Sequence, residues 1–87
     1  MAKKISSKLT LYHDPGHGWL KVPMKDIDTL GIRADISSWS FMEGGNAYLE
    51  TDADYAIYFQ AVERAGLVHP DITPIYVEKF DRNKERF

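Results

Sequence analysis

The alternation of hydrophobic and polar residues first predicts a β-hairpin over residues 9–22. Apolar or aromatic side chains recur along both halves of this stretch, and the segment 14–17 between them reads DPGH. Pro15 has the backbone angle that suits the second position of a tight turn, and Gly16 can supply the positive φ that a type II turn requires at the third. The chain is therefore expected to reverse there. The polar residues expected at the tip are His13, Asp14 and His17.

A first, short helix is predicted over residues 24–30. Met24, Ile27 and Leu30 recur at intervals of three, which places them on one face of a helix. Gly31 follows, and glycine favours the left-handed conformation that ends many helices. The helix is thus expected to bury this face and to stop at Gly31.

A second, longer helix is predicted over residues 53–65, where apolar side chains again share one face. They are Tyr55, Tyr58, Phe59, Val62 and Ala65. Thr51 or Asp52 is expected to accept hydrogen bonds from the free amides of the first turn, and Asp54 suits the positive end of the helix dipole. This capping role is preferred over an acid–base pair for the two aspartates. Gly66 is expected to end the helix.

Three further strands complete the pattern. Serine alternates with large apolar residues in the first of them, residues 36–43, and a Gly-Gly turn leads into the second, residues 47–50. The third, residues 75–80, also alternates. Pro74 at its start predicts an edge strand, because proline has no backbone N–H to donate to a second neighbour.

These elements form two strand-strand-helix units followed by a last strand. The predicted fold is α+β with the order ββαββαβ: a mostly antiparallel sheet of four to five strands, with both helices on one face. Residues 1–87 are expected to be a single domain. Residues 1–7 are predicted to be a flexible polar lead-in, and residues 81–87 a charged tail that is flexible or docks a partner.

Composition narrows the class of function. Of the 87 residues, 44% are hydrophobic and 28% are charged, which is typical of a folded domain, and the net charge is −2. Near-neutral charge argues against general nucleic-acid binding. The absence of cysteine excludes disulfides and thiolate metal sites, and fits a cytoplasmic protein. No apolar run suggests a signal peptide or a membrane span. The small core makes a homo-oligomer plausible.

The hairpin tip is the candidate site. His13, Asp14 and His17 are ligand types for zinc or another divalent ion, and His69 is a further histidine that could approach them. The H-D-x-x-H spacing is not a helical metal motif, because Pro15 prevents a helix. The alternative is structural: Asp14 accepts turn hydrogen bonds, His13 pairs across the hairpin and His17 is exposed. The preferred interpretation of the sequence includes no cofactor, no metal ligand and no catalytic residue. The rival interpretation is a metal-dependent hydrolase that uses His13, Asp14 and His17.

The aromatic content favours binding. Aromatic residues make up 13% of the chain, and a sheet covered on one face is expected to leave some of them on the other face or at its rim. Tryptophan and tyrosine there anchor protein interfaces, or alternatively stack nucleobases. Acidic residues interleave with the lysines and arginines, so a protein partner is preferred over nucleic acid. The predicted binding residues are Tyr12, His13, Asp14, His17 and Trp19.

The stretch YHDPGHGWL, followed by Leu30-Gly31 and by the segments 36–38 and 48–52, resembles small uncharacterised proteins carried by bacteriophages and prophages. The resemblance covers most of the chain and contains no catalytic signature. It implies a compact accessory protein that binds and inhibits a host defence or housekeeping machine, or a virus-encoded regulator. No functional residue follows from it. The sequence thus favours a small, non-enzymatic cytoplasmic protein that acts through a protein–protein interface.

Overall fold

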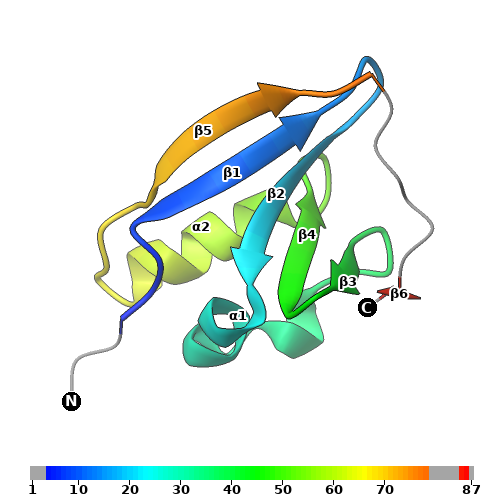
Figure 1. Ribbon diagram of the computed structural model, residues 1–87. Coiled ribbons are helices and arrows are strands. Elements are labelled where there is room, and N and C mark those ends of the chain that lie inside the picture. Colours follow the sequence, from blue (N-terminus) through cyan, green and yellow to red (C-terminus); the bar gives the residue numbers. More distant parts are fainter. Residues whose placement is uncertain (1–3, 79–84, 87) are drawn as a thin grey trace.

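The computed structural model describes residues 4–78 and 85–86, which form an α+β fold (Figure 1). In chain order the elements are β1 (Lys8–His13), β2 (Gly18–Pro23), α1 (Met24–Leu30), the 3-10 turn η1 (Arg33–Asp35), β3 (Phe41–Glu43), β4 (Asn46–Glu50), α2 (Tyr55–Arg64), β5 (Asp71–Tyr76) and β6 (Glu85–Arg86). The predicted order ββαββαβ is confirmed, and β6 adds a short strand. Gly31, with a φ of 68°, ends α1 as expected.

One six-stranded sheet runs through the molecule in the order β5-β1-β2-β4-β3-β6. Every neighbouring pair is antiparallel except β1 and β5, which are parallel. Both helices cover one face, as predicted (Figure 1). Their buried side chains join those of the strands in a single core; its members are Leu9, Leu20, Val22, Ile27, Ile32, Ile36, Ala47, Leu49, Tyr58, Ala61 and Val62.

The opposite face of the sheet carries a second apolar cluster, made of Trp19, Phe41 and Tyr48 with Tyr12 packed against them. These residues alternate along their strands with residues of the main core, because successive side chains point to opposite faces. Trp19 is only 2% exposed. The predicted binding residue Trp19 therefore does not present its ring at the surface.

The first hairpin forms where it is predicted, but its turn has a different chemistry. Gly16 does not have a positive φ, so the predicted type II turn is wrong. The Asp14 carboxylate instead accepts hydrogen bonds from the backbone N–H groups of Gly16 and His17, at 2.9 and 2.8 Å. The Asp14 N–H donates to the His17 carbonyl at 2.9 Å. The aspartate side chain organises the reversal, so no left-handed glycine is needed.

The second hairpin confirms the Gly-Gly turn, because Gly44 and Gly45 have φ angles of 59° and 79°. The predicted strand before it is wrong over residues 36–40, since β3 begins only at Phe41. Ser37 and Ser40 turn their hydroxyls to the buried carboxylate of Asp54. Ser37 and Ser40 therefore serve these hydrogen bonds and do not belong to a sheet face.

The start of α2 corrects the predicted cap. The helix begins at Tyr55, so Thr51 and Asp52 lie too far ahead to cap its first turn. Asp54 is the residue at the helix entrance, but its side chain makes no capping hydrogen bond. It accepts hydrogen bonds from the partly buried Ser37 and the fully buried Ser40 instead, because polar groups withdrawn from water need partners.

The last predicted strand is displaced along the chain. β5 spans Asp71–Tyr76 and not residues 75–80, of which 79–80 lie outside the described residues. The N–H groups of Asp71 and Val77 donate to carbonyls of Ser7 and His13, each at 2.8 Å. Since donors to one neighbour alternate along a strand, Pro74 falls at an outward position. β5 is an edge strand, as predicted, and it accommodates Pro74 in its middle for this reason.

Residues 4–7 of the predicted lead-in make specific contacts. Ile5 packs against the main core, and the Ser6 N–H donates to the buried carboxylate of Asp26 at 3.0 Å. Residues 1–3, and the tail apart from 85–86, lie outside the described residues. No helix in the described part of the chain combines the length and hydropathy needed to cross a bilayer.

Candidate metal centre

The tip of the first hairpin separates the predicted site residues. His13, at the end of β1, makes an edge-to-face contact with Tyr76 of β5, with ring centroids 5.5 Å apart. Asp14 is held in the turn by its backbone hydrogen bonds. His17 contacts the Trp19 ring at a centroid distance of 5.7 Å. Among the described residues the structure does not gather His13, Asp14 and His17 around one point, so the ligand set of the rival metal-dependent interpretation does not form.

His17 instead meets two carboxylates from a different part of the chain. One ligand atom each of His17, Glu50 and Asp52 lies within 4.8 Å of the others. Glu50 ends β4, and the register that pairs it with Trp19 brings it beside the hairpin. The Thr51 N–H donates to the Gly18 carbonyl at 3.0 Å, which fixes the connection that carries Asp52.

The close fit between the two segments depends on Gly18. A Cβ at this position would lie 3.1 and 3.3 Å from the side-chain atoms of Thr51. Such distances are tighter than ordinary contacts, so a larger residue would push Thr51 away. The small residue after His17 thus allows the β4–α2 connection to approach the turn.

Glu50 and His17 form an incomplete pair. Glu50 is 9% exposed, and its carboxylate makes no hydrogen bond within the described residues. The nearest atom of His17, Nδ1, is 3.7 Å from Glu50 Oε1, which is too long for a hydrogen bond. Nδ1 is itself shielded from solvent and has no hydrogen-bond partner in the part of the chain that the structure describes. A largely buried glutamate side chain and a shielded imidazole nitrogen therefore face each other, and neither group makes a hydrogen bond within the described residues.

These groups have the chemistry and spacing of a metal site. Imidazole nitrogen and carboxylate oxygen bind Zn²⁺ at about 2.0–2.2 Å, so two ligands of a tetrahedral ion lie about 3.4 Å apart. The observed 3.7 Å between Nδ1 and Oε1 requires only a small closure. His17 and Asp52 lie at the surface above the more deeply placed Glu50. An ion held there would keep coordination positions open to solvent.

Sequence reasoning placed His17 at the tip but missed Glu50 and Asp52. The sequence pattern places Glu50 in an ordinary strand and Asp52 at a helix cap. No spacing motif joins them to His17, because the contact depends on the register between β2 and β4. The one signal in the sequence that could indicate Glu50 and Asp52 is the presence of acidic residues at the end of a predicted strand, in a chain that also has a histidine-bearing turn.

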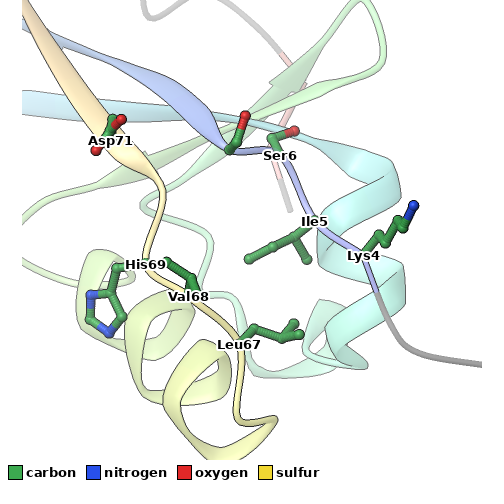
Figure 2. A pocket seen from close by; sticks show the side chains of 8 residues that line it. Lys4, Ile5, Ser6, Leu67, Val68, His69 and Asp71 are labelled. Atoms are coloured by element: carbon green, nitrogen blue, oxygen red, sulfur yellow. The ribbon is translucent and has the colours of Figure 1, made fainter.

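The remaining histidine lies elsewhere. His69 lines a pocket of about 380 Å³ between residues 4–7 and the loop after α2, at the other end of β1 from the hairpin tip (Figures 1 and 2). Its Nε2 is 3.1 Å from Glu63 Oε1, and its ring contacts Phe59 at 5.1 Å. His69 therefore does not approach the hairpin tip, which the sequence had left open as a possibility. Figure 2 shows the pocket walls formed by Ile5, Leu67 and Val68, with Lys4 extending away from them.

A comparison with known protein families, curated proteins and solved structures found no match to this chain. The resemblance to small bacteriophage proteins stays a prediction.

Proposed function

We propose that this protein binds one divalent transition-metal ion, Zn²⁺ or Mn²⁺, through His17, Glu50 and Asp52. The observation that supports the proposal is the largely buried Glu50 side chain, whose carboxylate makes no hydrogen bond among the described residues and faces a shielded imidazole nitrogen that also has no hydrogen-bond partner there. Burying an ionised carboxylate is costly unless a cation or donors compensate it. A divalent ion would satisfy Glu50 and His17 at once, and Asp52 would supply a third ligand.

Calorimetric titration of the purified, metal-free protein with ZnCl₂ and MnCl₂ tests this proposal. The wild type is expected to bind one ion per chain. Glu50→Gln keeps the size of the side chain but removes its charge, and should weaken binding at least about tenfold. His17→Gln should act in the same direction.

The matched control for the titration is His69→Gln. His69 also lies beside a glutamate, at 3.1 Å, but no third ligand joins that pair in the described structure. Its replacement should leave the affinity unchanged. The proposal is wrong if neither metal binds to the wild type, or if Glu50→Gln binds as tightly as the wild type does.

A second candidate function, binding of a protein partner from host or phage, is favoured by exposed side chains at the end of β5. Tyr76 is 59% exposed and Ile75 is 42% exposed, and Tyr76 contacts His13 of the neighbouring strand. Surface aromatic residues of this kind anchor interfaces. This proposal retains the predicted cytoplasmic location and moves the binding surface from Trp19 to β5.

Affinity purification from a bacterial lysate with the wild type and the double variant Ile75→Ser/Tyr76→Ala tests the second candidate. A protein captured by the wild type should be lost from the variant. Val68→Ser, a change at a strongly exposed apolar residue in the loop before β5, is the control and should retain it. Capture by both variants would contradict this surface.

A further inference from the structure

The hydroxyl of Ser40 links the candidate metal ligand Glu50 to a buried network. The backbone N–H of Glu50 donates to Ser40 Oγ at 3.0 Å, and this hydroxyl donates in turn to the Asp54 carboxylate. A serine hydroxyl can accept and donate at the same time, so both bonds coexist. Ser40 is fully buried, so the network is shielded from solvent at this residue.

Asp54 fixes which way the Ser40 hydroxyl points. Its carboxylate is almost completely buried and can only accept, so the Ser40 proton is directed to it and a lone pair is left for the Glu50 N–H. The same carboxylate accepts from the Ser37 N–H at 3.0 Å and the Ser37 hydroxyl at 2.7 Å. The loop before β3 is thereby tied to the entrance of α2.

The backbone of Glu50 is held from both sides. Its carbonyl accepts hydrogen bonds from the N–H groups of Ala53 and Asp54, at 3.1 and 2.9 Å. Its N–H is held by Ser40. Fixing both groups fixes the direction of the Cα–Cβ bond, and therefore the direction in which the carboxylate leaves the chain toward His17.

We infer that Ser40 is a positioning residue for the metal site: it aims Glu50 at His17 without touching the ion. This inference rests on the metal-binding function proposed above. Groups that orient metal ligands from outside the coordination sphere affect affinity by about 10- to 100-fold. Ser40 acts in this way through the backbone of a ligand and not through its side chain.

Ser37 provides a matched control. Ser37→Ala removes one hydrogen bond to Asp54, as Ser40→Ala does, but Ser37 makes no bond to Glu50. Both variants should melt at a lower temperature than the wild type without metal. Only Ser40→Ala should lose ion affinity, by about tenfold, whereas Ser37→Ala should stay within about twofold of the wild type.

The experiment is a calorimetric titration of the full chain with MnCl₂ and ZnCl₂ in the cold, with circular dichroism to establish that each variant is folded. Asp54→Asn replaces one of the two acceptor oxygens by an NH₂ donor at nearly constant size, so the three hydrogen bonds to this side chain can no longer all form; it is the second variant and should also weaken binding. If the wild type binds metal and the variants Ser40→Ala and Ser37→Ala bind it with equal affinity, the inference about Ser40 is wrong, while the proposed metal-binding function stands. A wild type that binds neither metal overturns the proposed function as well.

Discussion

At the residue scale, Tyr58 combines a core position with an unsatisfied polar group. Its side chain is fully buried, and the hydroxyl has no hydrogen-bond partner within the part of the chain that the structure describes. Burial, and next the negative charge of Asp26, raise the pKa of the Tyr58 phenol above its usual value of 10.0. The folded state therefore resists ionisation of this group more than the unfolded chain does.

Tyr58→Phe is expected to increase the free energy of unfolding by about 1 kcal/mol, because it removes a buried hydroxyl without a partner. It should also change the alkaline limb of the stability curve. In the wild type the unfolded chain ionises first, so the stability present below pH 10 is lost as the pH rises further, by up to about 1.4 kcal/mol per pH unit. Urea unfolding of both proteins between neutral and alkaline pH measures this difference; identical alkaline slopes would contradict the assignment.

A second prediction at this scale concerns Asp14. Asp14→Ala removes two side-chain hydrogen bonds that organise the hairpin turn, and should lower the free energy of unfolding by about 1 kcal/mol. Asp28→Ala is the control, since the Asp28 side chain forms, among the described residues, no contact but an exposed ion pair with Arg33 at 3.1 Å. Chemical denaturation should show a much smaller change for Asp28→Ala. An equally small change for Asp14→Ala would mean that Pro15 alone holds the turn.

At the scale of elements, β5 shows how an edge strand is protected. Pro74 lies midway along it at an outward position, where it removes one of the N–H groups that another strand would need. Pro74→Thr restores that donor and keeps a residue suited to a strand. We expect concentration-dependent association of this variant in light scattering, while the wild type stays at constant mass. Constant mass for the variant would show that the proline has no protective role.

At the scale of the whole molecule, the candidate metal centre joins the β1–β2 turn to the connection between β4 and α2. A ligand that binds only the folded state adds about 2.7 kcal/mol at one hundred times its dissociation constant. In a domain of this size each kcal/mol raises Tm by about 4–8 °C. Calorimetry with zinc at that excess should therefore show a rise of more than about 10 °C, and Glu50→Gln should show little.

Local patterns in the sequence determined those features whose physics is local. The bounds of α1 follow from the spacing of Met24, Ile27 and Leu30 and from the left-handed Gly31. The second turn follows from two glycines that accept positive φ. The first hairpin was predicted from alternation around Pro15, even though Asp14 and not Gly16 organises the turn. Each of these depends on residues within a few positions of one another.

Tertiary structure alone decided the site. Glu50 reaches His17 because β2 and β4 pair in one register, and a slip of one residue would turn its side chain to the other face of the sheet. The sequence pattern places Ser37 and Ser40 in a strand, but in the folded protein their hydroxyls donate hydrogen bonds to the buried carboxylate of Asp54. These partners lie far apart along the chain. The spacing of hydrophobic residues does not indicate which distant polar group will form hydrogen bonds with these side chains, because only the packing of the folded chain brings the partners together.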